Sequence, residues 1–407
     1  MAAQCPAHEK THPWLLFERS DITRASYRTW MLLGEAVSKC LHIARVPLRP
    51  ATAQELHRVF LAKGIHGTTA IEGNTLSEEE VKRSIEGKLK LPASREYLEK
   101  EVDNILRACN LVGREIAEQR MRPLSVARLT EFNALVLEGL PLGEGAVPGR
   151  IRRHRVGVGG YVPPDPRECF GLLDRLCGWL SRPILPAGFP HKNASDAIIR
   201  AILAHLYVAW IHPFGDGNGR TARLVEFQIL LGGGLPTPVA HLLSNHYNKT
   251  RAEYYRQLDR ARRLPDGICG FIEYALQGLV DGQRDAIRRI WLQQLDTTWR
   301  SHVYQQLKDL RNKPGERIRR LAFGFPLFRK NPFPLDAVPD LSPEIARTYA
   351  RLSERTLRRD LKELVEREVL AESAAGYSAN LQILGRWLPR GRLLWEELAA
   401  AEESAAT

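Results

Sequence analysis

The stretch His212-Pro-Phe-Gly-Asp-Gly-Asn-Gly-Arg-Thr-Ala-Arg223 contains the groups that a protein needs to hold a phosphate ester. Gly215, Gly217 and Gly219 alternate through it, so its backbone can adopt unusual dihedral angles and approach a ligand closely. A helix that begins at about residue 218 would offer its unpaired N–H groups and its positive dipole to an anion. The stretch therefore predicts a phosphate-binding turn at the start of a helix.

Helical patterns flank this turn on both sides. Apolar residues recur at helical spacing from residue 197 to residue 211, and Pro213 ends that pattern, because a residue before proline is pushed out of the α region. Residues 221–231 are again typical of a helix, which Gly232-Gly233-Gly234 terminates. The sequence thus predicts two core helices joined by the ligand-binding turn.

The polar side chains of the turn supply the chemistry. Arg220 and Arg223 are three residues apart, so both can reach the same anion. Asp216 offers a hard oxygen of the kind that Mg²⁺ takes beside phosphate oxygens. His212 is suited by its residue type to accept a hydroxyl proton near neutral pH. These groups predict transfer of a phosphate ester from a nucleotide. In the structural alternative, the stretch is a turn between two core helices that buries a histidine.

At every fixed position this stretch resembles the Fic-family signature HxFx(D/E)GNGRxxR. The resemblance implies that His212 is the general base, that Phe214 anchors the loop, and that Asp216 holds the Mg²⁺ that accompanies the substrate ATP. The intact glycines favour AMP transfer over transfer of phosphate or phosphocholine. The residues predicted to bind the ATP phosphates are Gly215, Gly217, Asn218, Gly219, Arg220, Thr221 and Arg223.

A second motif lies upstream, at Thr68-Thr-Ala-Ile-Glu72-Gly73, and matches the inhibitory motif of the same family, (S/T)xxxE(G/N). The resemblance implies that Glu72 forms an ion pair with Arg223 and occupies the γ-phosphate site. A carboxylate and a guanidinium make a short, charge-assisted contact, so the pairing is physically sound. In the structural alternative Glu72 is only the last residue of a helix. We expect Thr68 and Glu72 to be inhibitory; removal of AMP from modified proteins stays open.

Residues 151–162 alternate Arg and His with Ile and Val and end near Gly159-Gly160, which predicts a short β-hairpin. The segment resembles the family's flap, which holds the target as an added strand; an ordinary surface hairpin is the alternative. Downstream, residues 251–258 resemble the segment near the nucleotide base. Tyr254 or Tyr255 would pack on adenine there, unless both are core residues of an amphipathic helix.

The C-terminal part of the chain has the pattern of a winged helix. Residues 343–350 and 353–364 predict two short helices, and Gly376-Tyr377 would lie in the wing. The second helix of such a domain enters the major groove in DNA-binding proteins. Because Glu354 and Asp360 accompany the basic residues of this helix, DNA contact and protein contact fit equally well.

Length and composition constrain the class of protein. The 407 residues favour two or three domains, and 44% hydrophobic with 26% charged residues is ordinary for a globular protein. The net charge of +12 favours polyanionic partners or simply solubility. The 6 cysteines form no CxxC pair, which is typical of a reducing cytosol. With no signal-peptide pattern and no apolar run long enough for a bilayer, we expect a cytoplasmic protein without membrane contact.

We therefore expect a mainly α fold: a Fic-type helical core with a β-hairpin flap, plus a small C-terminal winged-helix (α/β) domain. The expected parts are an N-terminal helical region with the inhibitory motif (1–115), the Fic core (116–265), a helical connector and basic linker (266–334), the winged-helix-like domain (335–390) and a tail (391–407).

The expected function is protein adenylyltransferase, or AMPylator: AMP passes from ATP-Mg to a Tyr, Thr or Ser hydroxyl of an unidentified target protein, under autoinhibition by Glu72. One alternative is a DNA-binding regulator whose Fic core senses nucleotide. Another is a bifunctional enzyme that also removes AMP. A homo-oligomer is compatible with each of these functions.

Overall fold

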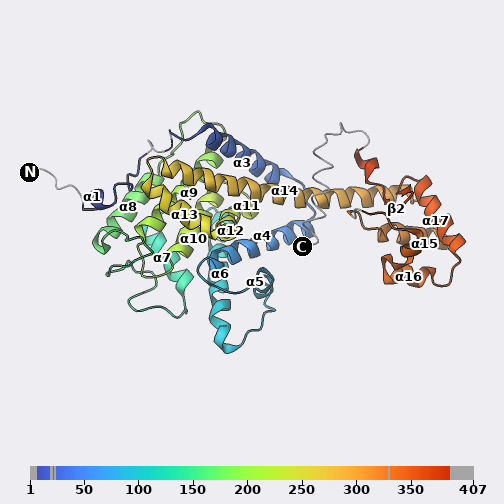
Figure 1. Ribbon diagram of the computed structural model, residues 1–407, viewed down its shortest axis with the longest axis horizontal. Helices are drawn as coiled ribbons and strands as arrows, with labels where there is room; N and C mark the ends of the chain where they lie inside the picture. The colour runs from blue at the N-terminus through green and yellow to red at the C-terminus, as the bar shows by residue number, and fades with distance from the viewer. Residues whose placement is uncertain (1–6, 19–21, 23, 329–330, 386–407) are drawn as a thin grey trace, which may run out of the picture. The chain divides into compact units, whose positions relative to one another are not determined.

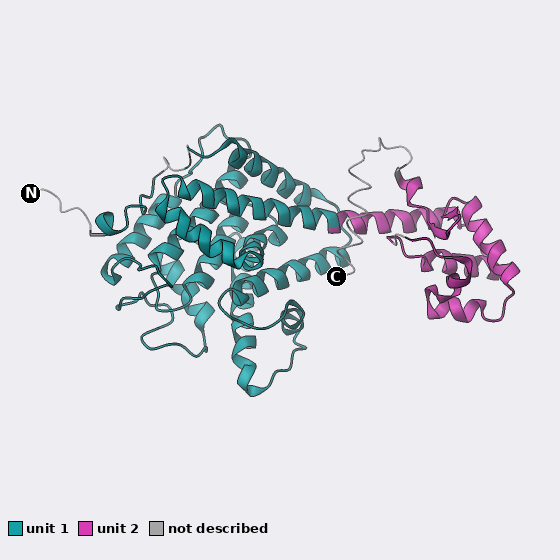
Figure 2. Ribbon diagram, viewed as in Figure 1, with its two compact units in different colours: residues 1–288 teal, residues 289–407 magenta. Residues whose placement is uncertain are grey.

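The computed structural model describes residues 7–18, 22, 24–328 and 331–385. The chain divides into two compact units, residues 1–288 and 289–407 (Figure 2). Most of the described chain is helical (Figure 1), and its one regular sheet has two strands, which confirms the mainly α fold. The segment expected as a connector, 266–334, is divided between the two units and does not form a separate part.

The helices of unit 1 follow one another along the chain, with a long connection at residues 138–168 between α7 and α8, and α14 begins in this unit and continues past residue 288. They are α1 (Ala7–Thr11), α3 (Tyr27–Arg45), α4 (Pro50–Ala70), α5 (Glu78–Ile85), α6 (Glu96–Ala117), α7 (Val126–Leu137), α8 (Cys169–Leu180), α9 (Lys192–Ile211), α10 (Asn218–Gly232), α11 (Thr237–Ala240), α12 (Leu242–Lys249), α13 (Arg251–Arg263) and α14 (Gly267–Gln306).

Helices α9 and α10 form the centre of unit 1. Leu206 of α9 and Val225 of α10 are completely buried, and nearly every residue of both helices is shielded from solvent. Burying such an aliphatic side chain contributes about 1.5–3 kcal/mol, so the two ends of the turn between these helices are fixed by packing. Although no bilayer-spanning run was expected, α9 is long and apolar enough to cross a membrane; 83% of its apolar stretch is buried, as in a core helix.

Helix α4 approaches its neighbours closely because two of its residues have no side chain. A Cβ atom on Gly64 would lie 2.3 Å from Nδ1 of His241, and one on Gly67 would lie 2.7 Å from the carbonyl oxygen of Ser244. The turn that follows α4 carries Glu72, and α5 begins after it with the expected capping box of Ser77 and Glu80. This packing holds the inhibitory motif against the central helices.

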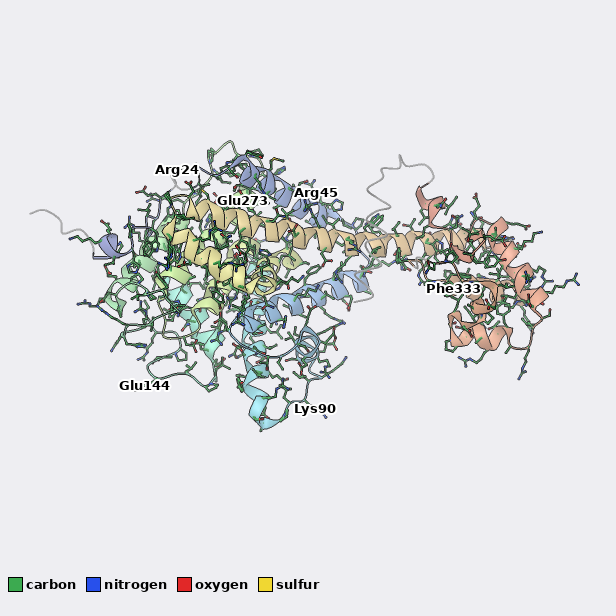
Figure 3. The ribbon with its side chains drawn as sticks, viewed as in Figure 1. Arg24, Arg45, Lys90, Glu144, Glu273 and Phe333 are labelled. Atoms are coloured by element: carbon green, nitrogen blue, oxygen red, sulfur yellow. The ribbon has the colours of Figure 1, made fainter. Side chains whose placement is uncertain are left out.

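Helix α3 is fastened to α14 by one carboxylate. Glu273, which is labelled in Figure 3, accepts hydrogen bonds from the hydroxyls of Ser26, at 2.8 Å, and Thr29, at 3.1 Å. Ser26 also caps the N-terminus of α3. The first helices of the chain are therefore part of unit 1.

The segment 151–162 folds back on itself at Gly159, where φ is +56°. Val158 and Tyr161 form an antiparallel bridge, with N···O distances of 2.9 and 3.0 Å, while Ile151 bridges to Phe214 in the turn after α9. A single bridge thus closes the expected hairpin. The start of the segment lies against the turn after α9, where Arg152 holds it by hydrogen bonds.

Unit 2 contains, in order, α15 (Lys313–Gly324), α16 (Pro343–Tyr349), α17 (Glu354–Glu366) and the antiparallel strands β1 (Leu370–Ser373) and β2 (Gly376–Ala379). Helices α16 and α17 lie where two short helices were expected, and β2 includes Gly376 and Tyr377. Phe333 bridges to Tyr377 beside β2. Short 3-10 turns lie at Leu335–Leu341 and Leu381–Gly385.

One expectation for this region is wrong. The basic linker was expected in the C-terminal part of the 266–334 segment, at about residues 312–334, whereas α15 occupies 313–324 and buries Ile318, Leu321 and Ala322 in the core of unit 2. The helix forms because Asn312 caps it, with Oδ1 accepting from the N–H of Gly315 at 2.9 Å, and because a proline is tolerated in a first turn.

Candidate active site

The turn between α9 and α10 has a backbone that its own sequence makes possible. His212 ends α9 in the left-handed region, with φ +46°, and Gly217 precedes α10 at φ +74°. Asn218 closes the turn, because its Oδ1 accepts from the N–H of Phe214 and its Nδ2 donates to the Phe214 carbonyl, both at 2.9 Å. Phe214 is completely buried. The turn is therefore a rigid loop anchored in the core, as the resemblance implies.

A buried asparagine of α7 supports this loop from outside. Nδ2 of Asn133 donates to the carbonyl of Asp216 at 2.9 Å and lies 3.3 Å from the hydroxyl of Thr221, while its Oδ1 accepts from the N–H of Gly149 at 3.0 Å. The same side chain thus positions the phosphate-binding turn and the start of the 151–162 segment. Sequence reasoning missed Asn133, because a single asparagine in a helical pattern gives no signal.

Arg152 was also missed, although it lies in the segment that sequence analysis selected. Its buried guanidinium donates to three carbonyls, of His212 at 2.8 Å, His154 at 3.0 Å and Pro164 at 2.6 Å. The alternating pattern of this segment gave no reason to expect a charged side chain pointing inward. Arg152 fixes the backbone on which the imidazole of His212 is mounted.

Arg220 belongs to a network of polar groups. Its Nη1 donates to Glu101 of α6 at 2.5 Å and its Nη2 to Asp216 at 3.1 Å. Glu101 is held in turn by Asn74, whose Nδ2 donates to it at 2.8 Å. This arrangement orients Arg220 at the start of α10, and Glu101 is a further residue that the sequence did not single out.

Arg223 and Glu72 are in direct contact. Nη2 of Arg223 lies 2.5 Å from Oε1 of Glu72 and 3.0 Å from the carbonyl oxygen of Thr68. Burial would raise the pKa of the Glu72 carboxyl, but the charge and hydrogen bond of Arg223, with the charge of Arg220, hold that pKa below its usual value. The carboxylate is therefore ionised at neutral pH. Thr68 takes part through its backbone.

Gly219 leaves the room for this contact. A Cβ atom at position 219 would lie 2.1 Å from Oε1 of Glu72 and 3.1 Å from Nη1 of Arg223. No other residue type fits there without moving one of the two charged groups. The glycine lies in the first turn of α10, where backbone N–H groups are free to bind an anion.

The imidazole of His212 is neutral at physiological pH. Burial lowers its pKa to about 4, against the opposing effects of the Ala209 carbonyl, Glu72 and Asp216 and with the added effect of Arg152. Nδ1 lies 3.4 Å from the Ala209 carbonyl. A proton on Nδ1, assigned from this contact, leaves Nε2 as the nitrogen that accepts a proton.

These groups surround one cavity of about 660 Å³, a size typical of sites for small ligands. The 158–161 turn and helix α13 form its other walls. Lining residues are Glu72, His212, Gly219 and Arg223 on one side and Tyr161, Tyr255 and Arg262 on the other.

The two candidate adenine residues differ in exposure, although both line the cavity. Tyr254 is 3% exposed, stacks on Tyr247 with ring centroids 4.9 Å apart, and lies with its hydroxyl 2.9 Å from Nε2 of His205. Tyr255 is 45% exposed. Tyr254 is therefore mainly a core residue, and Tyr255 has the free ring face. Arg262, which sequence reasoning missed, lies 5.1 Å from the ring centroid of Tyr161.

Asp216 is the residue expected to hold Mg²⁺. Its Oδ1 accepts from the N–H of Gly217 at 2.5 Å and from Arg220, and its side chain is 40% exposed. The described residues contain no cluster of three or more His, Cys, Asp or Glu side chains with metal-binding geometry. The donor set fits Mg²⁺ only as an ion held by one protein carboxylate together with phosphate oxygens, which is a usual arrangement for this metal.

Comparisons with known proteins agree with this geometry. Residues 123–230, which include the turn after α9, match the model of the Fic/DOC family. "Protein adenylyltransferase fic-1" of Caenorhabditis briggsae is 30% identical over 194 residues, which are 48% of this chain and 35% of that protein. "Protein adenylyltransferase Fic" of Drosophila ananassae is 29% identical over 197 residues, 48% of this chain and 36% of that protein. The chain thus spans about a third of the length of these curated relatives.

Two solved structures share the fold. A Fic family protein from Desulfovibrio desulfuricans G20 has a TM-score of 0.52 and 21% identity, with 86% of this chain and 92% of that chain covered. Fic-1 of Caenorhabditis elegans, residues 134–508, has a TM-score of 0.51 and 23% identity, with 65% and 73% covered.

Proposed function

Residues 123–230 of this chain form a Fic/DOC domain, and from that domain we propose that the protein is an adenylyltransferase that moves AMP from ATP to a hydroxyl group of another protein. The observation that carries the proposal is that His212 and Arg223 line one cavity, with Arg220 three residues before Arg223 in the first turn of α10. The names of the curated relatives support the same activity.

Each residue has a defined part in the proposed reaction. The ATP phosphates lie against the N–H groups of the 217–220 turn and the guanidinium groups of Arg220 and Arg223. A Tyr, Thr or Ser hydroxyl of the target gives its proton to Nε2 of His212 as its oxygen bonds to the α-phosphorus. The bond from that phosphorus to the bridging oxygen breaks, and pyrophosphate leaves. Mg²⁺ bound with ATP beside Asp216 supplies neutralisation of phosphate charge.

Arg152 and Asn133 would support the reaction by holding the loop in place rather than by touching the substrate. They hold the backbone of the loop at His212 and Asp216, so that base and phosphate cradle keep one geometry. Reacting groups that are already oriented need no reorganisation in the transition state. The 151–162 segment would hold an extended segment of the target by strand addition, at backbone groups other than those of Val158 and Tyr161, which are bridged to each other.

Glu72 would restrain this reaction. Its carboxylate uses the Nη2 atom of Arg223 that the γ-phosphate needs, so productive ATP binding requires Glu72 to leave. The contact is worth more here than at an open surface, because the Arg223 side chain is only 1% exposed and solvent screens it poorly. Autoinhibition follows from competition between two anions for one cation.

The test is AMP transfer from labelled ATP with Mg²⁺ by the wild type, Glu72→Gly and Glu72→Gly/His212→Ala. Strong labelling of the protein itself or of an added acceptor in Glu72→Gly alone is expected. Equal labelling in the double variant would remove His212 from the mechanism. If all three stay unlabelled while ATP binds, the domain senses nucleotide without transferring AMP.

Two further functions stay as alternatives. The order of elements in unit 2 favours a nucleic-acid contact, but Arg358 and Lys362 of α17 are ion-paired to Glu354 and Glu366, so DNA phosphates would compete with existing partners. A gel shift at low salt tests this contact. Removal of AMP by the Glu72 site is tested by incubating pre-modified target with Mg²⁺ and no ATP.

A further inference from the structure

A second cavity, of about 690 Å³, lies in unit 1 further along the helices that carry the active site. Gly219 and Arg223 of α10 line the nucleotide cavity, and Phe227 and Leu231, four and eight residues beyond Arg223 on the same helical face, line this one. Its walls come from α4, α6, α10 and the α11 region. They include His57, Leu61, Cys109, Arg114, Phe227 and Leu231.

The cavity combines an apolar interior with a basic rim. Leu61, Phe227 and Leu231 are buried apolar residues, and the ring of Phe227 stacks on His241 at 4.6 Å with an angle of 28°. None of its lining residues, all of which belong to the described chain, is acidic. Arg114 at its edge is exposed and has no ion pair with any described residue.

His241 leaves a polar atom unsatisfied in the wall. The residue is 4% exposed, and its Nε2 has no hydrogen-bond partner among the described residues. Burial, together with nearby His57, lowers the pKa of its imidazole to about 3, so the ring is neutral. The neutral ring adds no charge to the wall, so it does not oppose an apolar ligand.

We propose that this cavity binds a small apolar carboxylate, with the hydrocarbon on Leu61, Phe227 and Leu231 and the carboxylate toward Arg114. The volume suits a ligand of small-molecule size, for which pockets of about 300–1,000 Å³ are usual. Of the two lining arginines, Arg107 is ion-paired to Asp103 and Glu138, so Arg114 is the cation left for an anionic ligand. The apolar interior selects a hydrocarbon over a sugar or a nucleotide. This site is independent of the AMP transfer proposed above.

The site lies one layer of side chains from the phosphate-binding arginines. Cys109, Phe227 and His241 line both this cavity and a narrow cleft that touches Arg220 and Arg223. His57 and Leu61 belong to α4, the helix that leads to Glu72. A bound carboxylate would therefore contact the helix that carries the proposed restraint.

The test uses decanoate and, as a neutral probe of equal length, 1-decanol, titrated calorimetrically into the full chain below the micellar range of decanoate. Decanoate is expected to bind saturably with one site. Arg114→Gln should weaken decanoate about fivefold and leave decanol unchanged, in keeping with about 1 kcal/mol for a partly exposed charge contact. Arg58→Gln, an exposed arginine of α4 outside the cavity, is the matched control.

A second pair of variants tests the location. Leu231→Trp fills the interior and should abolish binding of both probes. Leu111→Trp, at a half-buried lining position, should also abolish binding of both probes and disturbs folding less. Thermal melting checks that each variant is folded. Absence of saturable binding, equal affinities for decanoate and decanol, or undiminished binding in Leu111→Trp would each overturn the proposal.

Discussion

Arg223 of α10 and Glu72, in the turn after α4, meet at 2.5 Å although 151 residues separate them in the chain. The contact pairs Arg223, which we propose to bind the terminal phosphate of ATP, with Glu72, which we propose to exclude that phosphate. Because Gly64 and Gly67 let α4 pack tightly on its neighbours, the position of Glu72 depends on that packing as much as on its own charge.

Replacing Glu72 by Gln should raise the affinity for ATP and lower the stability of the free protein. The amide no longer neutralises the buried guanidinium, so we expect a loss of about 1–3 kcal/mol in the free energy of unfolding, and about tenfold tighter ATP binding because the competing anion is gone. Denaturant unfolding and equilibrium binding of a non-hydrolysable ATP analogue measure both. Glu79→Gln, an exposed carboxylate of α5, is the control, and parallel behaviour of the two variants would contradict the competition.

The stability of the protein should depend on pH through His212. Its folded pKa of about 4 lies below the ordinary 6.5, so its contribution to stability is complete above pH 6.5 and is lost as the pH falls toward 4. The unfolded chain binds a proton in that window and the folded chain does not, which amounts to about 2–3 kcal/mol. Urea unfolding between about pH 7 and pH 4.5 measures this loss as the difference between wild type and His212→Gln, because the buried His241 contributes to the slope of both. His57→Gln, exposed on α4, should keep the wild-type slope; a wild-type slope in His212→Gln would refute the assignment.

Arg152→Lys should reduce both stability and AMP transfer although the charge is kept. A lysine cannot reach the three carbonyls of His212, His154 and Pro164 together, so the loop loses part of its support. We expect a loss of about 1–3 kcal/mol in unfolding free energy and a lower kcat with a smaller change in KM for ATP. Arg153→Lys, at the exposed neighbouring position, should behave as wild type. Unchanged turnover in Arg152→Lys would show that the loop does not need this clamp.

Substitution of Tyr255 should affect ATP binding, whereas substitution of Tyr254 should affect the stability of the fold. Tyr255→Ala removes the exposed ring in the nucleotide cavity and should raise the KM for ATP about tenfold, since stacking on a base is worth about 1–3 kcal/mol. Tyr254→Phe removes only the hydroxyl beside His205 and should lower the melting temperature with little effect on ATP. The reverse pattern would place adenine on Tyr254.

The parts of the structure that lie close together in sequence could be predicted, and those that depend on distant partners could not. The turn from His212 to Arg223 carries its own geometry in its glycines and in Asn218. The contact of Glu72 with Arg223 was reached only through a resemblance, and the structure places the two residues in that geometry. Asn133 and Glu101 escaped notice because each acts on a residue more than 80 positions away.

Helix α15 was missed for a different reason. The stretch was interpreted as a linker because it is basic, with Pro and Phe interspersed. A proline in a first turn marks the start of a helix as often as it breaks one, and the apolar residues Ile318, Leu321 and Ala322 then have a core to enter.

The lack of space at Gly219 restricts how this protein can change over evolutionary time. Any side chain there would disturb the Glu72 carboxylate, and it would also enter the site proposed for phosphate, so we expect no substitution at position 219 to release the proposed restraint and keep the proposed activity. A lineage that needs a constantly active enzyme has to change position 72 itself. Among descendants of this sequence, we therefore expect the proposed restraint to be lost by substitution of Glu72, while Gly219 is retained.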